Sequence, residues 1–257
     1  NEAQIAQLLK SASATNKGTL EGALDALRKT LLGAGVAATA EENREALYAN
    51  LYALQDSAEY RALKGGAALR LTAVQGRDEL VAKAKSDFGH FLAVKHLLPV
   101  AIEGSSGVLG TIHTDLYTQW QADKALTPEQ RKQGQATYTD DYLTDRAAFL
   151  TWKNKLALLD KEAAAAPYTD APDAWFRDYA TSLTIHLGAT TTDSTAKPRY
   201  LFGADQASGV EMLEGGSNAD RLYGGGGVDH LYGYGGHDHL EGGAGDDKLY
   251  GGDQDDV

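Results

Sequence analysis

The sequence predicts an α+β protein with an all-α helical amino-terminal domain, a short β junction and a carboxyl-terminal array of stacked repeats. Apolar residues recur at helical spacing through residues 1–173, and they alternate with polar residues in parts of the next segment. The last part of the chain repeats with a period of nine. We therefore expect a helical domain over 1–173, a β junction over 174–205 and a repeat domain over 206–257.

The negative charge of the chain is concentrated in its last part. The 257 residues carry a net charge of −12 and include no cysteine, which removes disulfides, thiolate metal sites and cysteine nucleophiles. Residues 203–257 hold 12 acidic and 2 basic side chains, a net charge of −10, together with 16 of the 29 glycines. A chain this acidic lacks the basic face that binding to nucleic acid requires, so we expect no nucleic-acid partner.

The helices are predicted from leucine spacing, capping signals and breakers. Leucines at i, i+4, i+7 and i+11 form one apolar stripe, and serine- or threonine-type capping boxes begin two further helices. The expected helices cover 20–31, 39–65, 78–99, 111–125, a short segment after Thr127-Pro128, and 140–161.

The β junction is predicted from a change of period. Leu183, Ile185 and Leu187 alternate with polar residues, and Arg199-Tyr200-Leu201-Phe202 forms a second short run typical of a strand. We expect this segment to cover the open edge of the first repeats.

The repeats keep one register without insertion. They are GGSNADRLY (215–223), GGGGVDHLY (224–232), GYGGHDHLE (233–241), GGAGDDKLY (242–250) and GGDQDDV (251–257). The sixth position is always aspartate, and the eighth is leucine wherever the repeat reaches it. Stacking would align the leucines into an apolar column, because one leucine cannot form a core within one repeat. Glycines allow tight turns, and one carboxylate per turn with nearby carbonyls supplies the all-oxygen ligands that suit Ca²⁺.

In GGGGVDHLY and GGAGDDKLY the sequence closely resembles the repeats-in-toxin (RTX) nonapeptide GGxGxDxUx, where U is a large apolar residue. The resemblance implies that six residues form a calcium-binding turn and three a short strand, with two repeats in each lap of a parallel β-roll. Calcium would then lie between turns 18 residues apart, with about three or more ions in all. The implied ligands are Asp220, Asp229, Asp238, Asp247, Asp256 and the carbonyls of Gly224, Gly226, Gly233, Gly235 and Gly242.

Several repeats depart from the family pattern. Asn218 and Tyr234 stand where glycine is expected, and the degenerate repeat QASGVEMLE (206–214) has Glu211 at its sixth position. Whether Glu211 contributes a ligand is left open. The last repeat ends before its strand, so we expect the roll to be truncated there.

The repeat region is compatible with two other interpretations. An acidic, glycine-rich segment is compatible with a disordered linker, but a linker would not keep glycine, aspartate and leucine in phase. His230, His237 and His239 form a second candidate metal set, although two of them share the variable seventh position and should point outward.

No catalytic motif is found, so the sequence favours a non-catalytic role and leaves enzymatic activity open. The segment Gly104-Ser105-Ser106-Gly107 has the wrong spacing for a nucleophile elbow. Asp87 and His90 stand at i and i+3 of a predicted helix, where they form either an acid–base pair or a structural hydrogen bond.

The resemblance implies a non-catalytic fragment of a larger secreted RTX toxin or exoprotein. Such a bacterial protein would leave the cell through the type I secretion machinery and fold its roll in extracellular calcium. Two alternatives remain: an accessory region of a secreted RTX lipase or hydrolase, or an adhesin module that binds a host membrane or protein target.

Overall fold

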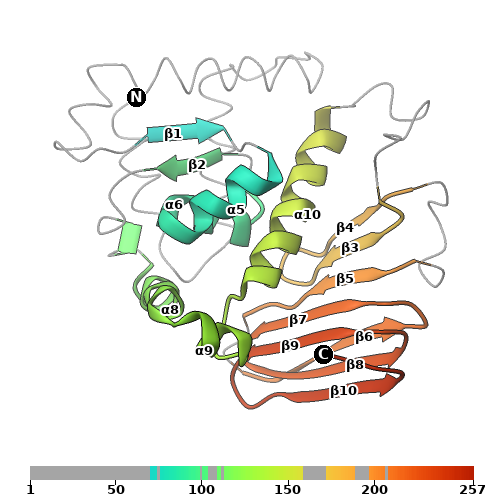
Figure 1. The fold of residues 1–257 in the computed structure, drawn as a ribbon. Coiled ribbons are helices and arrows are strands. Elements are labelled where there is room, and N and C mark those ends of the chain that lie inside the picture. The colour runs from blue at the N-terminus through green and yellow to red at the C-terminus, as the bar shows by residue number, and fades with distance from the viewer. Residues whose placement is uncertain are drawn as a thin grey trace. The chain divides into compact units, whose positions relative to one another are not determined.

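The computed structural model places helices and one small sheet in the first part of the chain and larger sheets in the last part (Figure 1). It describes residues 70–73, 76–98, 100–103, 109–110, 113–158, 172–188, 197–205 and 208–257. The helices expected over 20–31 and 39–65, and Gly104-Ser105-Ser106-Gly107, lie outside these residues. No helix in the described ranges is long and apolar enough to cross a membrane. The chain divides into two compact units, the first with residues 1–125 and 143–162 and the second with 126–142 and 163–257.

The first unit combines helices with one small sheet. Strand β1 (Arg70–Ala73) pairs antiparallel with β2 (Val100–Glu103). The all-α expectation for residues 1–173 is therefore wrong in the described part. The runs Leu71-Thr72 and Val100-Ala101-Ile102 are rich in β-branched and apolar residues, which favours strands over short spans.

The helix expected over 78–99 is two helices, α5 (Arg77–Ser86) and α6 (Phe88–Lys95). Asp87 separates them with extended backbone angles, φ −125° and ψ 121°. Its carboxylate accepts a hydrogen bond of 2.9 Å from the backbone N–H of His90, so it begins α6 as an N-cap.

Aromatic side chains form the core of the first unit. Phe88 and Phe91 stack with ring centroids 5.8 Å apart, and Trp120 lies 5.4 Å from Phe88. Trp120 belongs to α8 (Thr114–Ala125), which agrees with the helix expected over 111–125. Its buried indole N–H donates a 3.0 Å hydrogen bond to the carbonyl of Ala84, so this large ring is fully satisfied.

In the second unit the first helix is α9 (Pro128–Lys132). Thr127 and Gln130 form the predicted capping box, with hydrogen bonds of 3.2 and 2.9 Å in the two directions. The next helix, α10 (Asp140–Leu158), begins where the sequence predicted. Its first residues belong to the second unit, and the remainder belongs to the first.

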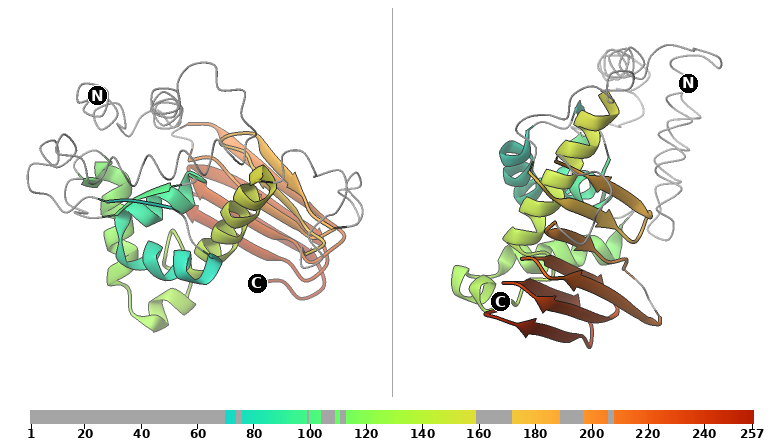
Figure 2. Two further views of the ribbon diagram at one scale, coloured as in Figure 1. Left: turned by 90° about the horizontal axis from the view of Figure 1, so that it is seen from above. Right: turned by 90° about the vertical axis from the view of Figure 1, so that its right-hand side faces the viewer.

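From β5 onward, successive strands of the second unit alternate between two sheets (Figure 2). One sheet has the order β4-β3-β5-β7-β9 and the other the order β10-β8-β6. All pairs are parallel except β3 with β4. The strands are β3 (Trp175–Asp178), β4 (Leu183–His186), β5 (Arg199–Phe202), β6 (Val210–Gly216), β7 (Arg221–Gly226), β8 (Val228–Gly235), β9 (His239–Ala244) and β10 (Lys248–Asp253).

The register of these strands equals two repeats. Leu213 pairs with Leu231 and Leu231 with Leu249 in one sheet, and Leu222 pairs with Leu240 in the other. Each repeat therefore contributes one strand, and successive repeats fall on opposite sheets. The carboxyl-terminal region thus consists of parallel strands in an arrangement consistent with a β-roll.

A column of leucines fills the space between the two layers. Leu201, Leu213, Leu222 and Leu231 are fully buried, and Leu240 is 8% exposed. Leu213 comes from the degenerate repeat, so that repeat keeps its place in the stack despite its altered glycines. Trp175 packs against the column from β3. Leu249, the last leucine, is 47% exposed on the outermost strand β10.

Candidate calcium site

The sixth-position aspartates lie at the point where each turn leads into its strand. Asp220, Asp229 and Asp238 are at most 2% exposed, although ionised carboxylates are rarely buried without a partner. Asp247 and Asp256 are half-buried, because they belong to the last repeats of the stack. The leucine two positions later points inward and fixes the aspartate on the same side of the strand.

Backbone hydrogen bonds join these aspartates into ladders with a spacing of 18 residues. The N–H of Asp220 donates to Oδ1 of Asp238 at 2.8 Å, and the N–H of Asp238 donates to Oδ1 of Asp256 at 3.0 Å. A parallel ladder on the other sheet joins the N–H of Asp229 to Oδ1 of Asp247 at 2.9 Å. The structure therefore brings together the three aspartate pairs that the RTX resemblance implies.

Several carboxylate oxygens at these positions are buried without a hydrogen-bond donor. Both oxygens of Asp229 and Oδ2 of Asp238 have no hydrogen-bond partner among the described residues. Burial raises the pKa of Asp229 to about 6, and the charges of Asp247, Glu211 and Asp205 add to the increase. Burial also raises the pKa of Asp220 to about 6, although hydrogen bonds from Arg199 and Gly216 oppose it. A buried anion without donors is costly unless a cation neutralises it.

Because the first glycine of each repeat has no side chain, a carboxylate oxygen and a carbonyl oxygen converge where its Cβ would lie. An ideal Cβ on Gly224 would lie 2.6 Å from Oδ2 of Asp229 and 2.5 Å from the carbonyl oxygen of Gly242. At Gly215 the corresponding distances are 2.8 Å to Oδ2 of Asp220 and 2.7 Å to the carbonyl oxygen of Gly233. Carboxylate and carbonyl oxygens together are the donor set that Ca²⁺ prefers, so the residues present fit a calcium ion.

The predicted glycines divide into two groups. Gly233 and Gly242 direct their carbonyl oxygens toward the aspartates of the preceding lap, and the carbonyl oxygen of Gly224 approaches Gly203 next to Glu211. Gly226 and Gly235 occupy the third position, where the nearest atoms to an added Cβ are 3.6 and 3.9 Å away. Their carbonyls remain predicted ligands.

Glu211 takes the aspartate position in the degenerate repeat. It pairs in register with Asp229, is 8% exposed and accepts a 2.7 Å hydrogen bond from the N–H of Ala204. Its longer side chain therefore reaches back to the preceding turn.

Two further residues complete the first turns and were not predicted. The N–H of Arg199 donates a 2.7 Å hydrogen bond to Oδ1 of Asp220, so β5 continues the aspartate ladder by one step. The Oδ1 atom of Asp205 lies 3.1 Å from an ideal Cβ on Gly225. Position within the repeat could not identify either residue, because both precede the segment that is in phase.

The remaining sequence candidates have structural roles or lie apart. Asp87 and His90 cap α6, with Oδ2 of Asp87 also 2.8 Å from Nδ1 of His90. His230, His237 and His239 do not gather: no metal-capable cluster among the described residues contains two of them.

The comparisons with known proteins identify the repeat type. The family model for the RTX calcium-binding nonapeptide repeat matches residues 207–240 and 232–257. Neither the curated proteins nor the solved structures contain a significant match to the chain. The last part of the chain is therefore a calcium-binding repeat array. Its repeats are RTX nonapeptides, as the sequence predicted.

Proposed function

We propose that residues 206–257 are a calcium-dependent folding switch in a non-catalytic part of a larger secreted RTX protein. The observation that carries this proposal is the pair of unpartnered, buried oxygens on Asp229, next to the converging carbonyl of Gly242. Without a cation this arrangement opposes folding, and with Ca²⁺ it favours folding.

The residues that would hold calcium are the aspartates 18 residues apart and the first-position glycine carbonyls. When bound, Ca²⁺ supplies positive charge that neutralises the carboxylates. The backbone N–H groups of Asp220, Asp229 and Asp238 orient the carboxylates of the next lap. Because neighbouring sites share aspartates such as Asp238, occupation of one site should prepare the next.

The size of the effect requires several sites to act together. Extracellular calcium modules have dissociation constants on the order of 10⁻⁴–10⁻³ M. At millimolar calcium each such site contributes roughly 0.5–1.5 kcal/mol of stability. One site would not offset the chain entropy of a glycine-rich array, so folding should be cooperative in calcium.

The place of action follows from the difference in calcium concentration between the cytosol, where calcium is scarce, and the exterior of the cell, where it is millimolar. We propose that the chain passes through a type I secretion channel while the repeats are unfolded, and that the roll forms outside the bacterium. The helical part would then belong to the exported protein, whose activity and host target lie beyond these repeats.

The test is a calcium titration of the whole chain followed by far-UV circular dichroism. We expect the β signal to rise steeply with calcium and to disappear in chelator. Asp229→Asn should raise the midpoint calcium concentration about tenfold or more, because it removes a buried ligand charge. Asp246→Asn removes the same charge from an exposed neighbour of Asp247, and it should leave the midpoint within about twofold.

Two results would contradict this proposal. One is a β signal that is equally strong in chelator and in calcium. The other is an equal shift for Asp229→Asn and Asp246→Asn, which would indicate a diffuse charge effect in place of specific ligands.

A further inference from the structure

The strand β9 carries a second group of metal-capable side chains, on the face opposite the leucine column. His239 and Glu241 flank the inward Leu240 and so point to the outer side of the sheet. Tyrosine fills the last position of the other three full repeats, whereas the repeat 233–241 has glutamate there, as the degenerate repeat does with Glu214. Glu241 is thus a departure from the repeat pattern that the calcium ladder does not use.

The segment before α10 meets this outer face within the same unit. Thr139 donates its hydroxyl to Glu241, with oxygen–oxygen distances of 2.8 and 2.7 Å, and accepts a 3.0 Å hydrogen bond from the N–H of Tyr142. The Tyr142 ring packs edge-on against Phe202 and Tyr223, with centroids 5.9 and 5.6 Å away. These contacts fix the start of α10 against β9.

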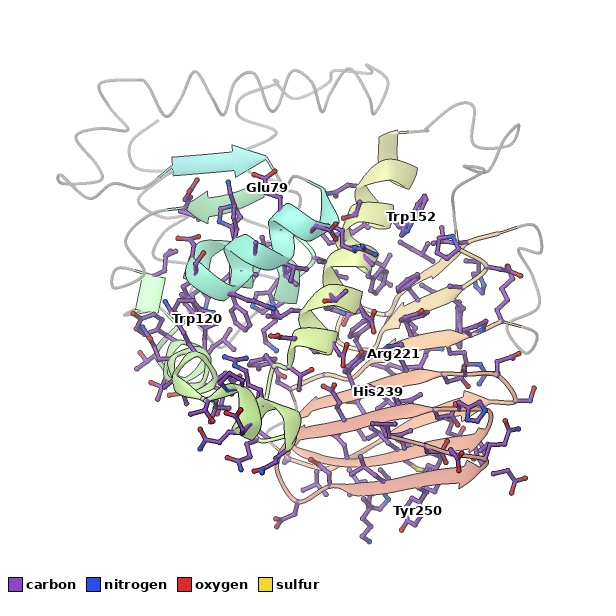
Figure 3. The ribbon with its side chains drawn as sticks, in the orientation of Figure 1. Glu79, Trp120, Trp152, Arg221, His239 and Tyr250 are labelled. Atoms are coloured by element: carbon purple, nitrogen blue, oxygen red, sulfur yellow. The ribbon has the colours of Figure 1, made fainter. Side chains whose placement is uncertain are left out.

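Asp141 is held next to the same point by Arg221. Nη2 of Arg221 lies 3.3 Å from Oδ1 of Asp141, and Arg221 is the register neighbour of His239 on β7. Figure 3 shows Arg221 and His239 on these adjacent strands. One ligand atom each from Asp141, His239 and Glu241 lies within 4.8 Å of the other two.

We propose that Asp141, His239 and Glu241 form a binding site for a divalent first-row transition metal, with Zn²⁺ as the best match. One imidazole and two carboxylates are ligands that zinc accepts, whereas the imidazole nitrogen makes the site a poor one for calcium. The site is therefore chemically distinct from the all-oxygen calcium ladder.

The geometry allows an ion to replace a hydrogen bond. Nε2 of His239 and Oε1 of Glu241 are 2.6 Å apart, within hydrogen-bond distance of each other. Ligand atoms about 2.0–2.1 Å from zinc in a tetrahedral site are separated by roughly 3.3 Å. A small opening of the His239–Glu241 pair and a closing of Asp141 would therefore surround the ion. Thr139 supplies the outer hydrogen bond that orients the Glu241 carboxylate.

An open cavity adjoins the three side chains. It has a volume of about 590 Å³, and its lining includes Arg131, Thr139, Asp141, His239 and Glu241. It gives an ion a route of entry and leaves room for a water or an exogenous ligand at a fourth position. Three protein ligands with one open position are the pattern seen in catalytic zinc sites.

Zinc binding to the whole chain tests the proposal. Isothermal titration is performed in calcium at a concentration that saturates the circular-dichroism signal, so that zinc cannot report on empty calcium sites. We expect one zinc ion per wild-type chain, and affinity about tenfold or more weaker for His239→Gln, because a lost ligand costs at least as much as a lost outer partner. Cobalt titration should give the visible absorption of a four-coordinate ion in the wild type and not in His239→Gln.

His230→Gln is the matched control, because His230 holds the same repeat position on β8 with Tyr232 where Glu241 would be. It should bind zinc within about twofold of wild type. Asp141→Asn provides a second test. This side chain is 61% exposed, so the substitution should not disturb folding, and a loss of zinc affinity would report on the lost ligand. The proposal is wrong if wild type binds no zinc in saturating calcium, or if either ligand variant binds as well as wild type. Equal loss in His230→Gln would also overturn it.

Discussion

Each position of the nonapeptide meets a different physical demand. In the repeats from residue 224 onward the second and fourth positions have positive φ, for example 95° at Gly243 and 136° at Gly245, which glycine adopts at little cost. The first position has ordinary backbone angles but no room, because an aspartate carboxylate and a carbonyl converge there. Tyr234, the second residue of the repeat 233–241, adopts φ 74°. The turn therefore keeps its shape there, although this backbone conformation is sterically unfavourable for a residue with a side chain.

This difference predicts opposite outcomes for two neighbouring glycines. A Cβ on Gly233 would lie 2.5 Å from the carbonyl oxygen of Gly251 and also strike the Asp238 carboxylate, whereas the nearest atom to a Cβ on Gly235 is 3.9 Å away. Gly233→Ala should raise the midpoint calcium concentration for folding about tenfold or more, which corresponds to roughly 1.4 kcal/mol for each calcium ion that binds with folding. Gly235→Ala should leave it unchanged or slightly lower, because alanine reduces the entropy of the unfolded chain.

Calcium titrations followed by circular dichroism compare the two variants directly. Both substitutions keep the backbone carbonyl, so a difference between them reports on space alone. Equal midpoints for Gly233→Ala and Gly235→Ala would contradict the packing argument.

At the scale of elements, the sequence predicts best where a local pattern repeats. The leucine at each eighth position determines which strand residues face inward, and the resulting register is the one observed for Leu213, Leu231 and Leu249. The break at Asp87 was missed because the apolar spacing continues into Phe88 and Phe91, and one extended residue leaves no mark on a helical period. Strands β1 and β2 were missed because a run such as Val100-Ala101-Ile102 is continuously apolar, and periodicity alone cannot assign such a run to a strand or a helix.

The candidate sites follow the same rule. The aspartate pairs could be predicted because they recur at a constant separation, so the repeat itself encodes their contact. The approach of Asp141 to Glu241 could not, because it depends on how Thr139 and Tyr142 pack on the outer face of the sheet. Contacts between segments 100 residues apart leave no periodic signal.

The burial of the leucine column predicts different losses of stability for an inner and an outer leucine. Leu231 is fully buried, whereas Leu249 is 47% exposed on β10. Leu231→Ala should therefore lower the free energy of unfolding by about 2–5 kcal/mol, and Leu249→Ala by less than about 1 kcal/mol. Chemical denaturation in saturating calcium measures both values, and similar losses for the two variants would show that the column is not the core of the array.

For the molecule as a whole, the net charge of −12 is a local property of the repeats. Residues 203–257 hold −10 of it, and the structure buries several of those carboxylates along the two ladders. Three bound calcium ions would add +6 and bring the repeat region near −4. The charge that opposes folding without calcium is thus the same charge that binds it.

The buried carboxylates predict that acid and calcium act in opposite ways. Burial raises the pKa of both Asp220 and Asp229 from 3.8 to about 6, so the calcium-free folded state binds more protons than the unfolded chain. The cost of burying these charges is absent below about pH 3.8, grows as pH rises, and is complete above about pH 6. Lowering the pH from 7.5 to 5 in chelator should therefore stabilise the folded array, on the order of 1 kcal/mol for each carboxylate.

In calcium the same change should raise the midpoint calcium concentration, because protons compete with the ion for the carboxylates. Circular dichroism across this pH range, with and without calcium, measures both trends. The double variant Asp220→Asn/Asp229→Asn should flatten the calcium-free profile, and a β signal that instead falls on acidification in chelator would show that these carboxylates do not control folding.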